Sequence, residues 1–177
     1  PYYRCQSRCA IPGEQEAFID MKQDRFDGKT ELDLEGVFNK LRLTGAYNDY
    51  THTEFEAPGE PGTVFNQDAY ELRFTADHAF GSGWRGTTGL QYVNVDFEAI
   101  GDEAFVPSST TKTLSLFAFE ERHFDDFTVE LGARAEQQKI QVEAELPDYD
   151  ETAVSLSAGG VWDFAEDHAL ALNLTRT

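Results

Sequence analysis

One imidazole and two carboxylates at alternate positions form the group best suited to bind a ligand. His52, Glu54 and Glu56 lie in the segment YNDYTHTEFE, and in an extended strand residues two apart project from the same face. Imidazole and carboxylate groups are common ligands of divalent transition ions. Because two residues span about 7 Å along a strand, we predict that His52 and Glu54 can share a metal ion only with ligands from elsewhere.

Acidic residues in the segments between predicted strands form a second candidate group. The net charge of −19 argues against nucleic-acid binding, which requires a basic surface. The same charge would attract a cation or a cationic complex, although a solvated outer surface would have the same composition. We predict that ligand capture involves His52, Glu54, Glu56, Asp102 and Glu103. Other acidic residues of these segments are Glu60, Glu98, Glu143, Glu145, Asp148, Asp150 and Glu151.

The two cysteines, Cys5 and Cys9, lie four residues apart in a polar segment. With no further cysteine and no neighbouring histidine, the pair lacks the four ligands of a typical zinc site. In an oxidising compartment it is expected to close a small disulfide loop. Residues 1–16 show no hydrophobic periodicity and are predicted to be a loop.

The sequence lacks the motifs of common enzyme classes. It contains no GxSxG, HExxH or Walker segment, and no pairing of serine with histidine stands out. We therefore expect that the protein is not an enzyme and has no resident cofactor.

The candidate residues lie within or beside segments that alternate between apolar and polar residues, which is the pattern of β-strands. The clearest example places Trp84, Gly86, Thr88, Leu90 and Tyr92 on one face. In the segment 111–121 both faces carry apolar residues, so the sequence leaves open which one faces outward. The predicted strands cover residues 18–34, 41–56, 63–78, 84–98, 111–121, 127–136, 154–162 and 169–177.

The length of these strands and the charges on one face of each favour a transmembrane barrel over a soluble sandwich. Five consecutive same-face residues of the first strand are charged, from Arg25 to Asp33, and a dry core would not accommodate them. Aromatic residues cluster beside the turns, as in the interfacial girdles of outer-membrane barrels. Short connections near 35–40, 78–83, 124–126 and 165–168 alternate with longer ones near 56–62, 99–110 and 143–151. The predicted fold is all-β, an antiparallel transmembrane β-barrel with about eight strands in this chain.

Several segments resemble the barrel of TonB-dependent outer-membrane receptors, and most closely the branch that includes zinc-uptake receptors. The resemblance rests on FIDMKQDRFDGK, LRLTGAYNDYTHTEFE, GTVFNQDAYELR, GWRGTTGLQY, GDEAFVP, ELGARAE and SLSAGGVWDF. It implies a 22-stranded barrel with a plug domain, located in the outer membrane of a Gram-negative bacterium. It also implies that the partners are outer-membrane lipid, lipopolysaccharide and, through the plug, the TonB complex.

The resemblance implies uptake of a scarce nutrient, such as zinc, another metal ion or a metal complex. We expect residues 1–16 to belong to an extracellular loop and residues 17–177 to be barrel strands of a larger receptor, with the plug outside this chain. The alternative is a complete eight-stranded barrel with a structural or adhesive role. That alternative requires the eighth strand to pair with the first.

Overall fold

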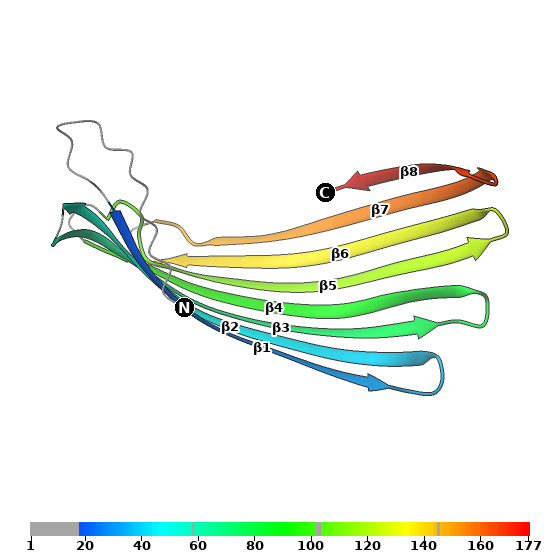
Figure 1. The fold of residues 1–177 in the computed structure, drawn as a ribbon, viewed down its shortest axis with the longest axis horizontal. Helices are drawn as coiled ribbons and strands as arrows, with labels where there is room; N and C mark the ends of the chain where they lie inside the picture. The colour runs from blue at the N-terminus through cyan, green and yellow to red at the C-terminus, as the bar shows by residue number, and fades with distance from the viewer. Residues whose placement is uncertain (1–17, 58, 102–103, 145) are drawn as a thin grey trace.

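The computed structural model describes residues 18–57, 59–101, 104–144 and 146–177, and these residues form eight β-strands (Figure 1). Alternating side-chain polarity and frequent β-branched and aromatic residues explain why these segments are strands. The strands are β1 (Phe18–Asp33), β2 (Phe38–Ala57), β3 (Glu60–Ala79), β4 (Trp84–Ile100), β5 (Ser109–Phe124), β6 (Phe127–Val142), β7 (Tyr149–Ala165) and β8 (His168–Arg176).

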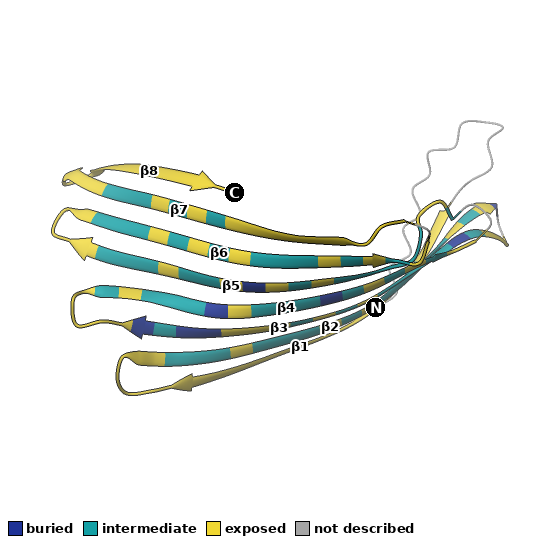
Figure 2. Cartoon of the chain, turned by 180° about the vertical axis from the view of Figure 1, so that it is seen from behind, coloured by how far each residue is buried: buried dark blue, intermediate teal, exposed yellow. Residues whose placement is uncertain are grey.

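The strands form one antiparallel sheet in which every strand pairs with its neighbours in sequence. Within the described residues β1 and β8 do not pair, so the sheet is open (Figure 1). Both edge strands are largely exposed, as the yellow colour of β8 shows in Figure 2. The closed eight-stranded barrel that we considered as an alternative is therefore not formed.

Each strand contributes to two chemically different faces. The apolar face includes Leu43 of β2, Phe74 of β3, Leu90 of β4 and Leu116 of β5, which are direct partners across the sheet. The polar face includes Arg42 of β2, Thr75 of β3 and, in β1, Glu31. Because adjacent residues of a strand point to opposite sides, the alternation in the sequence produces both faces directly.

The apolar face is uncovered by any other part of the described chain. Ala57 and Ala76 are the only buried hydrophobic residues in the described ranges, whereas Leu116 is 60% exposed and Leu172 is 71% exposed. A soluble protein would bury such a surface against a second layer. The sheet therefore needs an apolar environment on this side.

Aromatic residues bound this apolar band at both ends. Phe26, Tyr47 and Tyr70 are consecutive cross-strand partners at the end that leads to the longer connections, which we call the loop end. Trp84 and Trp162 lie at the opposite end, beside the short turns, which we call the turn end. The predicted aromatic girdles are therefore present. No helix in the described ranges is long and apolar enough to cross a membrane.

Strand pairing establishes the orientation of β5, which the sequence left open. Leu90 of β4 pairs with Leu116, and Gly89 pairs with Phe117. The leucines Leu114 and Leu116 therefore lie on the apolar face, while Phe117 and Phe119 lie on the polar face. Phe117 has room there because its partner lacks a side chain: an ideal Cβ on Gly89 would lie 2.4 Å from the Phe117 Cζ atom.

Several strands extend further than we predicted. The segment 56–62 was predicted to be a loop, but β2 continues to Ala57 and β3 begins at Glu60, so Glu56 and Glu60 are strand residues. Positive φ at Gly59 (86°) permits the tight connection between them. At the turn end β2 already begins at Phe38, and at the loop end β7 begins at Tyr149. The prolines and glycines of the segment 56–62 do mark a turn. The two strands of the long hairpin nevertheless stay paired up to that turn, so they are longer than predicted.

Candidate functional site

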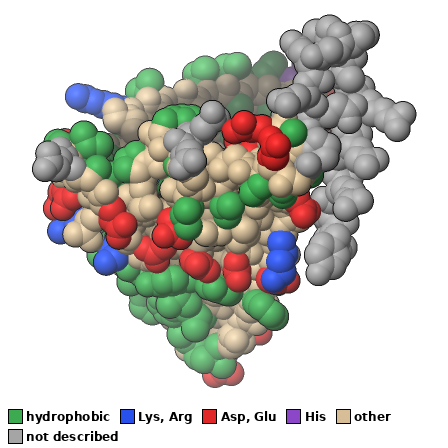
Figure 3. Space-filling model, turned by 90° about the vertical axis from the view of Figure 1, so that its left-hand side faces the viewer, with side chains coloured by type: hydrophobic (Ala, Val, Ile, Leu, Met, Phe, Trp, Pro, Cys, Tyr) green, Lys and Arg blue, Asp and Glu red, His purple; other side chains and the backbone are tan. Residues whose placement is uncertain are grey.

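The loop end of the molecule is acidic. Seen from this end, acidic side chains spread across the surface and basic side chains are few (Figure 3). Some of the acidic groups have partners: the Asp150 carboxylate accepts a hydrogen bond from Gln137 Nε2 at 3.0 Å and lies 3.0 Å from Lys139 Nζ. Asp150 lies beyond the apolar band, and these two contacts, first Gln137 and then Lys139, lower the pKa of its carboxyl group.

His52 lies on the polar face of β2 near the loop end, within a group of aromatic rings. Its imidazole stacks on Phe65 of β3 with 4.5 Å between ring centroids and an interplanar angle of 16°. The ring centroid of Tyr50, two residues away on β2, lies 5.4 Å from that of the imidazole, and the Phe65 ring in turn lies 6.1 Å from the Phe97 ring of β4. The side chain of His52 is 19% exposed, so this aromatic group fixes the orientation of the imidazole.

Glu54 lies next to this imidazole on the same face. The His52 Nε2 atom and the Glu54 Oε1 atom are 3.9 Å apart. This separation is much shorter than the distance of about 7 Å that two residues span along a strand. The His52 Nδ1 atom is buried and has no hydrogen-bond partner in the described part of the chain. His52 and Glu54 therefore lie on one face with their side chains close together, and their role as metal ligands stays a prediction.

The other predicted site residues are less completely placed. Glu56 is on β2, and an ideal Cβ on Gly62 would lie 3.0 Å from its Oε1 atom. Asp102 and Glu103, like Cys5 and Cys9, lie outside the described residues. The described residues contain no group of three or more His, Cys, Asp or Glu side chains placed to hold a metal ion. Metal binding and the disulfide thus remain predictions.

The three histidines near the short turns differ from His52. Each lies near the end of a strand, beside one of the short turns. His78 of β3 is buried and its Nε2 atom lies 2.7 Å from Glu120 Oε1. His123 Nδ1 lies 2.7 Å from Thr128 Oγ1, and the His168 ring lies 5.9 Å from the Phe164 ring.

Arginines and carboxylates form ion pairs along the polar face. The Arg42 Nε atom donates to Glu31 Oε1 at 2.7 Å across the β1–β2 pair, and Arg85 donates to Glu121 across the β4–β5 pair. Arg73 is an exception, since it has no carboxylate partner in the described ranges. Its guanidinium lies 4.7 Å from the centre of the Phe117 ring.

A compact polar group surrounds Phe117, and sequence reasoning missed it. Arg134 of β6 lies on the other side of the same ring at 6.0 Å. Arg134 also donates to the Ser115 hydroxyl (2.8 Å), which donates to Glu136 Oε2 (2.8 Å). Ser115 is 1% exposed and is the most buried side chain of the described chain. The sequence could have revealed this group only if it had shown that Phe117 lies on the polar face.

Replacing Ser115 with alanine is expected to destabilise the sheet by about 1–2 kcal/mol, because the buried Ser115 hydroxyl links Arg134 to Glu136 and both hydrogen bonds are lost. Chemical denaturation of the receptor in detergent, followed by tryptophan fluorescence, measures this change. Ser155→Ala is the matched control, since Ser155 is on the same face and its side chain makes no hydrogen bond within the described residues. Equal stability of the two variants would contradict the assigned network.

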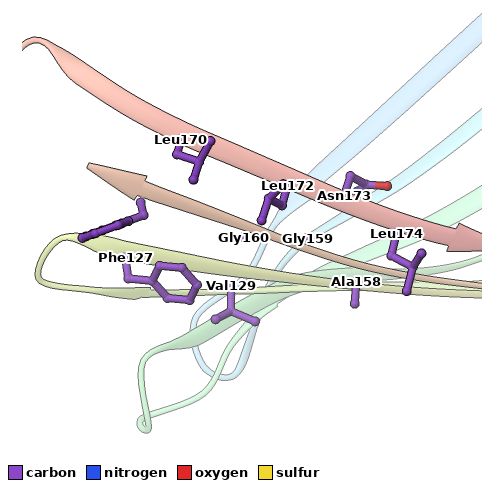
Figure 4. A pocket seen from close by; sticks show the side chains of 10 residues that line it. Phe127, Val129, Ala158, Gly159, Gly160, Leu170, Leu172, Asn173 and Leu174 are labelled. Carbon is purple, nitrogen blue, oxygen red and sulfur yellow. The ribbon is translucent and has the colours of Figure 1, made fainter. Parts of the chain in front are cut away.

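A groove of about 830 Å³ lies on the apolar face over β6, β7 and β8 (Figure 4). It is lined almost entirely by apolar side chains and glycine, among them Phe127, Val129, Trp162 and Leu172. Such a lining offers no chemistry for a polar nutrient, so the groove is not the ligand site.

Comparison with known protein families shows which kind of protein contains this sheet. The family described as TonB dependent receptor-like, beta-barrel matches residues 12–177, which include every strand of the sheet. Proteins with this domain lie in the Gram-negative outer membrane, interact with TonB and with outer-membrane lipid, and are transporters rather than enzymes. The uncovered apolar face is thus the lipid-facing side of a transmembrane barrel, and this chain belongs to the TonB-dependent receptor family.

Proposed function

We propose that this receptor takes up a scarce nutrient that contains a metal ion, such as zinc, and that capture occurs at the loop end of the polar face. The observation that carries the proposal is the separation of 3.9 Å between His52 Nε2 and Glu54 Oε1. Zinc binds imidazole nitrogen at about 2.0–2.1 Å and carboxylate oxygen at about 2.0–2.2 Å. Since the sum of these distances exceeds the observed separation, both atoms can reach one ion.

A metal complex suits this site better than a bare ion. Zinc is commonly bound by three or four protein ligands, whereas the described residues bring only an imidazole and one carboxylate together. A chelator would supply the missing ligands. Its organic part would contact the neighbouring aromatic rings, which are Tyr50 and Phe65 beside the imidazole and Phe97 beside Phe65.

Charge at the loop end supports capture of a cationic complex. The described strands carry more carboxylates than basic groups there (Figure 3), and such a field raises the local concentration of a cation. Asp102 and Glu103 are proposed to extend this field. After capture, energy from the TonB complex would move a plug domain, and the arginines of the polar face would contact that plug. Lipopolysaccharide is the proposed neighbour of the acidic outer surface.

Replacing His52 with alanine is expected to weaken binding of the metal complex at least about tenfold, because a direct ligand is lost. Replacing Phe65 with alanine should weaken binding of the complex but leave the affinity for free Zn²⁺ nearly unchanged, since only the chelator contacts the ring. Isothermal titration of the purified receptor with free Zn²⁺ and with Zn²⁺ complexed by small aromatic chelators measures both effects.

His123→Ala is the matched control, because His123 lies at the turn end and hydrogen-bonds to Thr128. It should bind as the wild type does. If His52→Ala and His123→Ala bind all metal species equally well, the proposed site is wrong. If free Zn²⁺ binds as tightly as any complex, the bare ion is the ligand.

A further inference from the structure

Near the turn end, the apolar face carries an ionisable pair that the proposed transport function does not use. His78 of β3 and Glu120 of β5 lie on either side of β4, and their side chains meet over Gly86. The His78 Nε2 atom lies 2.7 Å from Glu120 Oε1. An ideal Cβ on Gly86 would lie 2.9 Å from the other Glu120 oxygen, Oε2. The glycine therefore permits a contact between two strands that are not neighbours.

The surroundings of His78 are mostly apolar. Its side chain is 5% exposed, and the rings of Phe38 and Phe80 lie 6.0 Å and 4.8 Å from it. The Nδ1 atom is buried without a hydrogen-bond partner in the described ranges. The contact with His78 uses one oxygen of the Glu120 carboxylate, Oε1. The other oxygen, Oε2, is left for a further hydrogen bond.

A cation lies two residues further along the same face. Arg122 pairs with Trp84 across the β4–β5 ladder, and its guanidinium lies 5.8 Å from the Trp84 ring and 4.7 Å from the Phe124 ring. It has no carboxylate partner within the described chain. Two aromatic rings thus hold the guanidinium at the boundary of the apolar band, where its donors remain available.

We propose that Glu120 and Arg122 bind the headgroup of one phospholipid whose phosphate is joined to a primary ammonium group, phosphatidylethanolamine. Short turns of bacterial barrels face the periplasm, so this end of the face contacts the phospholipid leaflet. A guanidinium recognises a phosphate through paired N–H donors. The Glu120 carboxylate, 30% exposed, accepts hydrogen bonds from the ammonium.

The charge pattern selects this lipid over other headgroups. Glu120 and Arg122 lie two residues apart on one face of β5 and carry opposite charges, so together they offer a partner to each charge of a zwitterion. A choline headgroup has no N–H to donate to Glu120, and a glycerol headgroup brings no positive charge. Both would still offer a phosphate to Arg122.

The test uses native mass spectrometry of the intact receptor with equimolar ethanolamine, choline and glycerol phospholipids that have the same acyl chains. The wild type should retain the ethanolamine lipid about tenfold more than the choline lipid, since a charge-assisted hydrogen bond distinguishes them. Glu120→Gln should abolish this preference while preserving the contact with His78. Arg122→Gln should reduce retention of all three lipids, and Arg122→Lys should restore part of it.

Glu130→Gln is the control, because Glu130 pairs with Glu121 on the polar face and should not affect lipid retention. Heat-dependent gel mobility checks that each variant is folded. Equal retention of the ethanolamine and choline lipids by the wild type would overturn the proposal. So would a preference that survives Glu120→Gln in a folded receptor.

Discussion

Alanine in place of Gly86 should sharply reduce the amount of folded receptor in the outer membrane. An ideal Cβ at this position would lie 2.2 Å from the carbonyl oxygen of Phe119. That carbonyl belongs to the neighbouring strand β5, so it cannot move away without disturbing the pairing of β4 with β5. Overpacking of this kind costs about 1–3 kcal/mol, and the same methyl group would displace Glu120 from its contact with His78.

The yield of heat-modifiable receptor in outer-membrane fractions measures this loss. Gly28→Ala is the matched control, because Gly28 lies on the apolar face of β1 and an ideal Cβ there meets no atom within 4 Å. We expect this control to fold as the wild type does, since it has space for the methyl group. Equal yields for Gly86→Ala and Gly28→Ala would show that β4 and β5 are further apart than described.

Arginine in place of Leu116 is expected to destabilise the barrel by about 2–4 kcal/mol, the usual cost of an arginine facing the middle of the bilayer. Leu116 is 60% exposed on the apolar face and pairs with Leu90 and Ala135, so its neighbours offer no counter-charge. Unfolding of the receptor by urea in phospholipid vesicles gives the free-energy change.

Thr113→Arg provides the comparison within the same strand. Thr113 lies on the polar face, opposite Val93 and Gln138, and an arginine there remains in contact with polar groups and water. We expect a change of less than about 1 kcal/mol, as for an ordinary surface substitution. A larger cost for Thr113→Arg than for Leu116→Arg would mean that β5 has the opposite orientation.

The geometry of the proposed ligand site was only partly predictable from the sequence. Alternation placed His52 and Glu54 on one face, because side-chain direction in a strand depends only on position. It gave no indication that Phe65 stacks on the imidazole, since that contact depends on the register between β2 and β3. Asp102 and Glu103 lie outside the described residues, so their part in ligand capture stays a prediction.

The sequence by itself determined the fold class, the two faces of most strands and the acidic character of the loop end, because period-two polarity and charge are local properties. Tertiary structure decided whatever depends on which strands lie side by side. The orientation of β5 required the pairing of Gly89 with Phe117, since both of its faces are apolar enough for either environment. The contact between His78 and Glu120 required three strands in register and a glycine between them. These two residues are 42 positions apart in the chain, and the sequence does not indicate that they are in contact. Only the register of the paired strands brings them together.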